Sequence, residues 1–136
     1  MTSIRPARPR VPWGMLIGRF IGPILIVTGI ITALPVLQFF FPRPMLKLLS
    51  GVTISDEAGL LFARHWGLVT LTIGALLVFA ASAPAARTAI VAAVLVEKVG
   101  YAALVLGHWR SLPKMRSSGL FDVLCSALYV AYLAGA

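Results

Sequence analysis

Four long apolar segments, separated by short polar ones, make up most of the chain. They cover residues 20–41, 60–81, 88–108 and 119–136. Each is about as long as a helix needs to cross a bilayer core of ~30 Å at ~1.5 Å per residue. The pattern therefore predicts an all-α protein with four membrane-spanning helices. Because the links between the runs are short, we expect an up-down-up-down four-helix bundle.

The segment before the first apolar run is basic and rich in proline, with arginines at positions 5, 8 and 10. We interpret residues 1–13 as a disordered basic tail and residues 14–136 as a single four-span transmembrane domain. A signal peptide is the alternative interpretation of the N-terminus. However, the run 20–41 is longer than the ~7–15 residues of an h-region, and it lacks a clear small-x-small cleavage site.

Composition supports the membrane interpretation. Hydrophobic residues make up 60% of the chain and charged residues only 12%, with a mean hydropathy of +0.96. A soluble domain of this size could not hide so much apolar surface. The net charge of +8 would suggest nucleic acid in a soluble protein, but here the basic residues lie mostly in the tail and loops. We therefore expect membrane lipids as partners, and no nucleic acid.

Cysteine content and loop charge carry less information. The single cysteine, Cys125, excludes an intrachain disulfide and a cysteine-based metal cluster. Four arginines up to Arg19 favour a cytoplasmic N-terminus, although the loop after the third run also carries three basic residues. We predict a multi-pass protein of the cell membrane with both termini in the cytoplasm.

Glycines recur at every fourth position near the N-terminus, at Gly14, Gly18 and Gly22. This spacing places them on one helical face, where another backbone can approach closely. We predict that this face packs against another helix, from this chain, a second copy or a larger membrane complex. Chance spacing in a glycine-rich segment is the alternative. Pro23 and Pro35 are expected to bend this first helix.

A very short turn, residues 82–87, makes the second and third spans an antiparallel hairpin. The start of the second span and the end of the third must then meet the same face of the membrane. We therefore expect His65-Trp66 and His108-Trp109 to share that face.

Two adjacent charged residues, Glu97 and Lys98, lie near the middle of the third run. A charge at this depth costs at least ~2.5 kcal/mol, so it must face protein or water. Glu97 lies about 60° from a face of small residues, at ~100° per residue, and we expect it to point into the bundle. Lys98 then projects away from that face and needs a separate partner. The small residues are Ala86, Ala89, Ala93, Gly100, Ala103 and Gly107.

The last span carries a polar stripe that should face inward. Its members, at helical spacing, are Ser118, Asp122, Cys125, Ser126 and Tyr129. We predict a pair between Arg64 and Asp122, with Glu97 and Tyr101 deeper, forming a polar chamber that opens toward the two tryptophans. The candidate ligand-binding residues are Glu97, Tyr101, Arg64, Asp122, His65 and His108. A structural ion-pair network is the alternative interpretation.

A metal site built from His65, His108 and Asp122 is conceivable by ligand type, but no two of them have ligand spacing on one helix. We predict no metal. The chain has no phosphate-binding loop, no nucleophile–base motif and no haem-type histidine pair at mid-depth. We therefore assign no catalytic residues and expect no cofactor.

Several short segments carry a resemblance to a known family. They are residues 44–51, Ala63-Arg64-His65-Trp66-Gly67, Val96-Glu97-Lys98 and Asp122. With these, residues 20–133 resemble the DoxX-like family of small bacterial four-span proteins. The resemblance implies a four-helix membrane bundle and an association with quinone-linked oxidoreductase systems. This chain lacks the second cysteine needed for thiol redox chemistry, so the resemblance favours an accessory or ligand-binding role over a direct redox role.

Three functions follow from these features. The first is a binding protein that holds a lipid, quinone or isoprenoid in the polar chamber around Glu97. The second is an accessory or scaffold subunit of a quinone-linked oxidoreductase complex in the membrane. The third is a small isomerase or redox enzyme that uses Glu97 or Asp122 as general acid or base. The sequence does not decide whether the protein is an enzyme.

Overall fold

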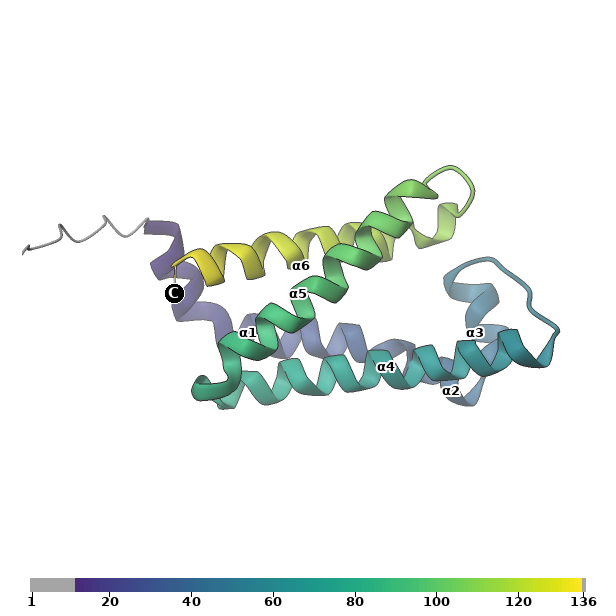
Figure 1. Cartoon of the computed structure of the whole chain (residues 1–136), viewed down its shortest axis with the longest axis horizontal. Helices are drawn as coiled ribbons and strands as arrows, with labels where there is room; N and C mark the ends of the chain where they lie inside the picture. The colour runs from purple at the N-terminus through teal and green to yellow at the C-terminus, as the bar shows by residue number, and fades with distance from the viewer. Residues whose placement is uncertain (1–11, 136) are drawn as a thin grey trace, which may run out of the picture.

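The computed structural model describes residues 12–135, which are helical apart from short connections (Figure 1). Four helical stretches are long and apolar enough to cross a membrane: Met15–Phe40, Glu57–Ser82, Pro84–Gly107 and Pro113–Gly135. The prediction of an all-α membrane four-helix bundle is confirmed. The chain is a multi-pass membrane protein.

The first span is interrupted near its end by proline. It consists of α1 (Pro12–Ala33), the 3₁₀ turn η1 (Leu34–Val36) and α2 (Leu37–Phe40). Pro35 lies within η1, and because proline lacks a backbone N–H it cannot continue the α-helical hydrogen-bond pattern. Residues 12 and 13 of the predicted tail are the first residues of α1. The rest of that tail lies outside the described residues.

The short helix α3 (Pro42–Leu49) precedes a non-helical segment, and the second span is α4 (Glu57–Ser82). Asp56 caps α4, because its Oδ1 accepts a hydrogen bond of 2.7 Å from the backbone N–H of Gly59. Such caps satisfy one of the amides that a helix start leaves free. This cap fixes the point at which α4 begins.

Only Ala83 separates α4 from the third span, α5 (Pro84–Gly107). Arg87 stabilises this turn, since its Nε and Nη2 donate to the carbonyls of Ala80 and Ala81 at 2.9 and 2.8 Å. Those carbonyls belong to the last turn of α4, where helical partners are missing. The predicted antiparallel hairpin is confirmed. The last span consists of the turn η2 (Pro113–Met115) and α6 (Arg116–Gly135).

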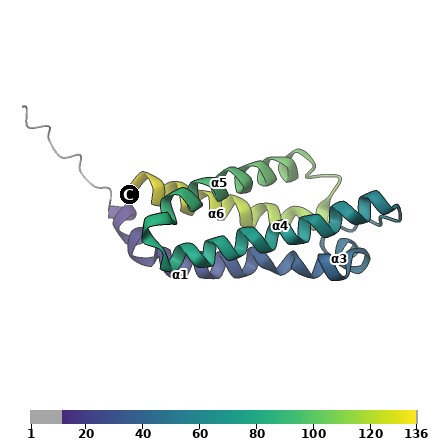
Figure 2. The same cartoon turned by 60° about the horizontal axis from the view of Figure 1, so that its bottom comes forward.

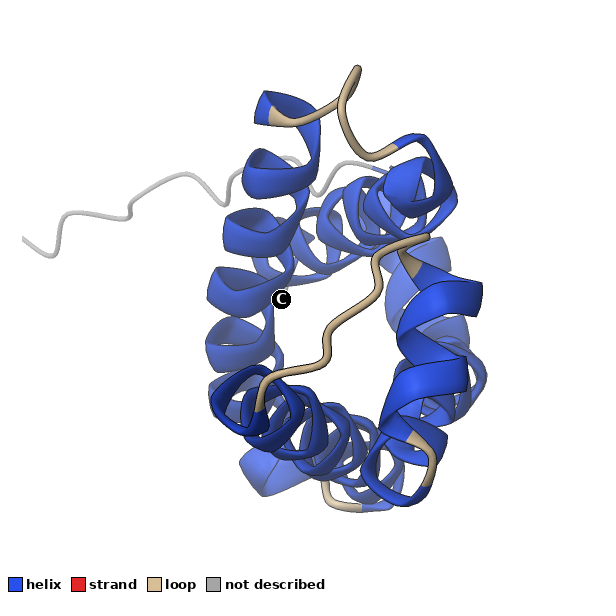
Figure 3. Ribbon diagram, turned by 90° about the vertical axis from the view of Figure 1, so that its right-hand side faces the viewer, coloured by secondary structure: helices blue, strands red, loops and turns tan. Residues whose placement is uncertain are grey.

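The bundle is narrow at one end and wide at the other. The start of α1, the α4–α5 turn and the end of α6 lie together at the narrow end (Figure 1). From there α5 diverges from α4 (Figures 1 and 2), and α6 diverges from α1 (Figure 1). The wide end carries α3 and the connection from α5 to α6. In Figure 3, which faces this end, the segment between α3 and α4 crosses the space between the helices.

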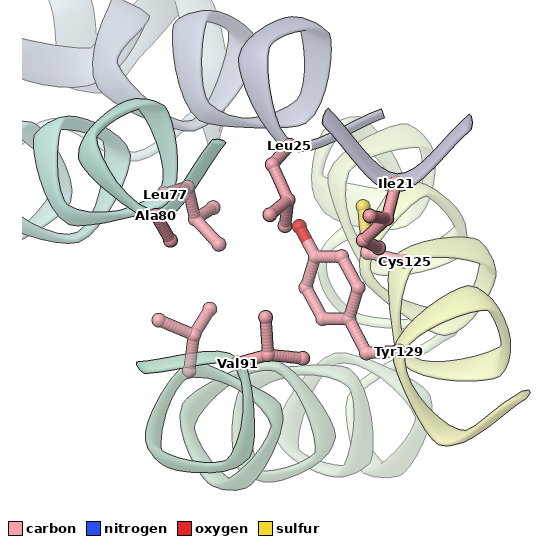
Figure 4. Close-up of a cluster of buried hydrophobic side chains, with 8 residues drawn as sticks. Ile21, Leu25, Leu77, Ala80, Val91, Cys125 and Tyr129 are labelled. Carbon is pink, nitrogen blue, oxygen red and sulfur yellow. The ribbon is translucent and has the colours of Figure 1, made fainter. Parts of the chain in front are cut away.

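The hydrophobic core fills the narrow end. All four spans contribute to it: Ile21 and Leu25 from α1, Leu77 and Ala80 from α4, Val91 and Val94 from α5, and Cys125 and Tyr129 from α6. The ring of Tyr129 extends toward Leu25 among these side chains (Figure 4). Its hydroxyl lies 2.7 Å from Thr28 Oγ1, which itself donates to the carbonyl of Ile24. Tyr129 is therefore the donor, and this bond joins α6 to α1.

Helices α1 and α4 approach each other closely at Gly29 and Gly74. A Cβ added to Gly29 would lie 2.7 Å from the carbonyl oxygen of Gly74. The predicted Gly14, Gly18, Gly22 face makes no such crossing within the described chain: a Cβ on Gly18 meets no atom within 4 Å, and one on Gly22 only Ala81 O at 3.9 Å. The surroundings of Gly14 lie outside the described residues. Packing of this face against a second copy or a partner stays a prediction.

Candidate functional site

A buried ion pair joins α5 to α6. Lys98 Nζ donates a hydrogen bond of 2.8 Å to Asp122 Oδ1, and the two residues are only 3% and 4% exposed. The ammonium also lies 5.6 Å from the centre of the Phe121 ring, within cation–π range. Removal of Lys98 would leave the buried carboxylate of Asp122 without a cation, and removal of Asp122 would leave the Lys98 ammonium with only the Glu97 carboxylate, 3.8 Å away. The pair therefore fixes α5 against α6.

The predicted pair between Arg64 and Asp122 is wrong, because Asp122 is bonded to Lys98. Arg64 is exposed on α4. It lies near the helix end, where a long cationic side chain can reach the headgroup region. Lys98 lies in the middle of α5 and has no such route to water. The carboxylate of Asp122 therefore neutralises the deeper cation.

The predicted inward face of α5 is also wrong. The helix buries Val91, Val94, Lys98, Ala102 and Val105. Most of the small residues expected to face inward are instead exposed: Ala89, Ala93, Gly100, Ala103 and Gly107. Small residues favour interfaces where two backbones come close. Because α5 diverges from α4, longer side chains are needed to reach the neighbouring helices.

Glu97 consequently lies at the border of the bundle rather than at its centre. Its side chain is 24% exposed, and its Oε2 lies 3.8 Å from Lys98 Nζ. The separate partner expected for Lys98 is Asp122, but the neighbouring Glu97 also lies beside the ammonium, so that two carboxylates flank it. The three groups have a formal net charge of −1. Glu97 Oε2 is buried and has no hydrogen-bond partner within residues 12–135.

A cavity of about 530 Å³ opens beside this charged cluster. Its polar lining comes from all four spans, with Thr32 on α1, Thr70 on α4, Glu97 and Lys98 on α5, and Asp122 on α6. The remaining wall is mostly apolar and includes Ile31, Leu34, Leu37, Met45 and Phe121. We call this the inner cavity. Its size lies within the ~300–1,000 Å³ that is typical of small-molecule sites.

A second cavity, of about 690 Å³, adjoins the inner one near α3. We call it the outer cavity. The two share Trp66, Tyr101, Ser117 and Ser118 in their walls, together with residues of η1 and α3. The rings of Trp66 and Tyr101 stack at 5.8 Å, and the Tyr101 hydroxyl lies 3.0 Å from Ser118 Oγ. The shared wall makes the two cavities neighbouring parts of one slot.

At the wide end of the bundle, beside the outer cavity, η2 contacts α3 and the residues that follow it. Lys114 Nζ, from η2, donates to the carbonyl of Lys47, on α3, at 3.2 Å. The methylene chain of Lys114 also lies against Gly51, where an added Cβ would be 3.2 Å from it. Gly51 has a φ of +76°, a conformation that favours glycine. These contacts hold α3 and the start of α6 close to one another.

The other predicted site residues divide into two groups. Tyr101 lines both cavities, and His65, although exposed, lines the outer one. His108 is exposed, contributes to the wall of neither cavity, and has its Nδ1 2.9 Å from the carbonyl of Leu104. Within the part of the chain that the structure describes, no three His, Cys, Asp or Glu residues are grouped as metal ligands would be. His65, His108 and Asp122 are not brought together.

The cavity residues that the sequence analysis did not propose include Thr32, Thr70 and Phe121. Thr32 is 6% exposed, and its hydroxyl has no partner among the described residues, whereas Thr28 and Thr70 each donate to a carbonyl of their own helix. The spacing of Thr28 and Thr32, four residues apart in an apolar run, was a usable signal for a polar face. Phe121 gave no signal, because an apolar residue in a span is unremarkable.

Comparison of the chain with protein-family models, curated proteins and solved structures finds no match. The resemblance to DoxX-like proteins therefore stays a prediction that rests on the short segments themselves.

Proposed function

We propose that the protein binds a lipophilic small molecule in the inner cavity, with the polar end of that molecule against Glu97 and Lys98. The cavity has mostly apolar walls and a few polar groups gathered at one place, a combination typical of ligand sites. Charged side chains inside membrane spans are expensive, and they commonly mark such sites. A lipid, isoprenoid or quinone-type molecule matches this arrangement.

The observation that carries the proposal is the carboxylate of Glu97. Lys98 and Asp122 form a complete ion pair, which explains both as structural residues. Glu97 is not required for that pair, yet its Oε2 is buried beside the cavity without a hydrogen-bond partner in the described chain. A second carboxylate is an expensive addition to an ion pair that is already balanced. A ligand that forms a hydrogen bond with Glu97 would compensate the cost of burying this carboxylate.

The test is to fill the cavity without touching its charges. Ser117 lines both cavities and is exposed at the start of α6, so Ser117→Trp places a large ring between them. Ala127→Trp, on an exposed position of the same helix, is the matched control. Native mass spectrometry of the purified protein should show a bound lipophile in the wild type and in Ala127→Trp, but not in Ser117→Trp. Equal retention in all three would contradict the proposal.

A second candidate function is an accessory subunit of a larger membrane complex, and the outward face of α5 favours it. Gly100 and Gly107 are exposed, and a Cβ on either would meet no atom within 4 Å among the described residues. Small residues on a lipid-facing surface allow close approach of another helix. Gly100→Leu should then dissociate a complex isolated from native membranes in mild detergent. Unchanged migration of that complex would count against this role.

A further inference from the structure

Two buried polar atoms in the wall of the inner cavity have no hydrogen-bond partner within residues 12–135: Thr32 Oγ1 and Glu97 Oε2. Buried polar atoms are normally bonded, so exceptions need an explanation. Thr32 is 94% buried, since only 6% of it is exposed. It comes from α1, whereas Glu97 comes from α5, so two distant parts of the chain contribute free polar atoms to one cavity.

The chemistry of Glu97 restricts what can complete this site. The Lys98 ammonium, 3.8 Å from Glu97 Oε2, favours the ionised form of this carboxylate, and an ionised carboxylate only accepts hydrogen bonds. Its partner must therefore donate one, which a hydroxyl group does and which a ketone, ether or quinone oxygen does not. Thr32 has a hydroxyl that can donate or accept. Lys98 carries three N–H groups, of which one is directed to Asp122.

The charges beside the cavity also restrict the ligand. An anionic headgroup would add to the net negative charge of Glu97, Lys98 and Asp122. A cationic headgroup would be attracted by that net charge, but it would approach the Lys98 ammonium and would lose its hydration in the cavity. Like charges at short range are most unfavourable where water is excluded. An uncharged group avoids both penalties. A neutral hydroxyl can donate to Glu97 while its oxygen accepts from Thr32 or Lys98.

We infer that the inner cavity selects lipophiles that end in an uncharged hydroxyl group, which donates to Glu97. This inference rests on the proposed binding function and names the ligand class for it. Two sources share the chemistry: a long-chain or isoprenoid alcohol, and the reduced hydroquinone form of a quinone. Phosphorylated lipids, lipophilic amines, ethers and oxidised quinones are the excluded classes.

The experiment compares probes that share one tail. Displacement of tritiated farnesol from the purified protein in lipid nanodiscs is measured with farnesol, its methyl ether, farnesyl phosphate and farnesylamine. A short-chain ubiquinol and its ubiquinone are measured by direct binding and identify the second source. We expect farnesol to bind at least about tenfold more tightly than its ether, phosphate and amine, or ubiquinol at least about tenfold more tightly than ubiquinone. A tenfold difference in affinity corresponds to ~1.4 kcal/mol of binding free energy. Tight binding of ubiquinol alone would identify a hydroquinone as the source.

Two variants test whether the preference for a hydroxyl group depends on Glu97 and Thr32. Glu97→Gln replaces one acceptor oxygen with an N–H donor, so the advantage of the alcohol over the ether should fall to less than about threefold. Thr32→Val should weaken alcohol binding. The matched controls are Glu57→Gln at the start of α4 and Thr72→Val on its exposed face, and both should behave as the wild type.

The outcomes separate the two levels of the proposal. If the alcohol binds no better than the ether, the phosphate or the amine, and the ubiquinol no better than the ubiquinone, the hydroxyl inference is overturned while a lipophile site remains. If none of the six probes binds, the proposed binding function fails as well. A preference for the hydroxyl that persists in Glu97→Gln would remove Glu97 from the site.

Discussion

Lys98 on α5 and Asp122 on α6 form a hydrogen-bonded ion pair of 2.8 Å, although 24 residues separate them in the chain. Both line the inner cavity. Their contact therefore joins two spans and at the same time defines the polar end of the candidate site. Glu97, beside the pair, is the group that distinguishes a ligand site from a structural ion pair.

Removal of one partner of this pair should destabilise the protein strongly. We expect Asp122→Asn and Lys98→Met each to lower the free energy of unfolding by ~3–5 kcal/mol. The first leaves the buried ammonium without its hydrogen-bonded partner and with only Glu97 at 3.8 Å, and the second leaves the Asp122 carboxylate without a cation. Reversible unfolding in mixed detergent micelles measures this loss. The double variant Lys98→Met, Asp122→Leu should recover much of the stability, since apolar residues can replace a buried pair.

Asp56→Asn is the control for the same chemical change at an exposed position. Asn also caps helices well, so its effect should be within about 1 kcal/mol. Losses for Asp122→Asn as small as those for Asp56→Asn would show that the pair does not hold the spans together.

Glu97→Gln should cost much less stability than Asp122→Asn. Its carboxylate lies 3.8 Å from Lys98, beyond hydrogen-bond distance, and its side chain is 24% exposed. We expect a difference of at least ~2 kcal/mol between the two variants in the same unfolding assay, since only Asp122 is the bonded partner of a buried charge. Equal losses would make Glu97 part of a structural network and would remove the main argument for a ligand site.

The Gly29–Gly74 crossing should be the most sensitive glycine contact. A Cβ at Gly29 would lie 2.7 Å from the Gly74 carbonyl oxygen, and its neighbours there are mostly backbone or Cβ atoms. Gly29→Ala should therefore cost about 1–3 kcal/mol through overpacking. Gly18→Ala, which meets no described atom within 4 Å, is the matched control and should leave the stability of a monomer unchanged.

Gly18→Leu tests the predicted contact with a second copy. If the Gly14, Gly18, Gly22 face forms an interface between molecules, this variant should reduce the oligomeric state measured by light scattering in detergent. An unchanged oligomeric state would contradict that contact without affecting the ligand site.

The number of spans, the hairpin and the inward stripe of α6 could be predicted from the sequence, because each depends on local pattern. Run length and hydropathy determine the spans, and a short turn allows only an antiparallel pair. The stripe is inward as expected at Asp122, Cys125 and Tyr129, which are all buried, whereas Ser126 is half-buried and Ser118 is exposed. The stripe can be recognised in the sequence because the helical repeat of α6 alone determines the spacing of its polar residues.

The rotation of α5 could not be predicted in the same way. Glu97 and Lys98 are about 100° apart on the helix, so a modest rotation decides which of them is buried. The small-residue face predicts a rotation of α5 in which the helix packs closely against its neighbours along its whole length. The divergence of α5 from α4 (Figure 1) contradicts that expectation, and residues of both helices line the two cavities. The inward Asp122 predicts a cation on a neighbouring helix, but the sequence alone does not decide between Arg64 and Lys98 as that cation.

Membrane orientation can be tested with single cysteines in a Cys125→Ala background. Lys47→Cys and Lys114→Cys lie at the wide end of the bundle, and Ala85→Cys lies on the α4–α5 turn at the narrow end. Because the termini are predicted to be cytoplasmic, the first two should react with an impermeant maleimide added to whole cells, and Ala85→Cys only after lysis. The reverse pattern would invert the topology, and labelling of all three from outside would contradict a four-span arrangement.

The most direct test of the binding site is to locate a bound lipophile. A diazirine-bearing isoprenoid alcohol, activated by light in nanodiscs, should label inner-cavity residues such as Thr32 and Phe121, as found by tandem mass spectrometry. An excess of unlabelled alcohol should abolish this labelling, and Ser117→Trp should prevent it. Labelling confined to lipid-facing positions such as Val96 and Val130, without competition, would contradict the claim that this cavity is a binding site.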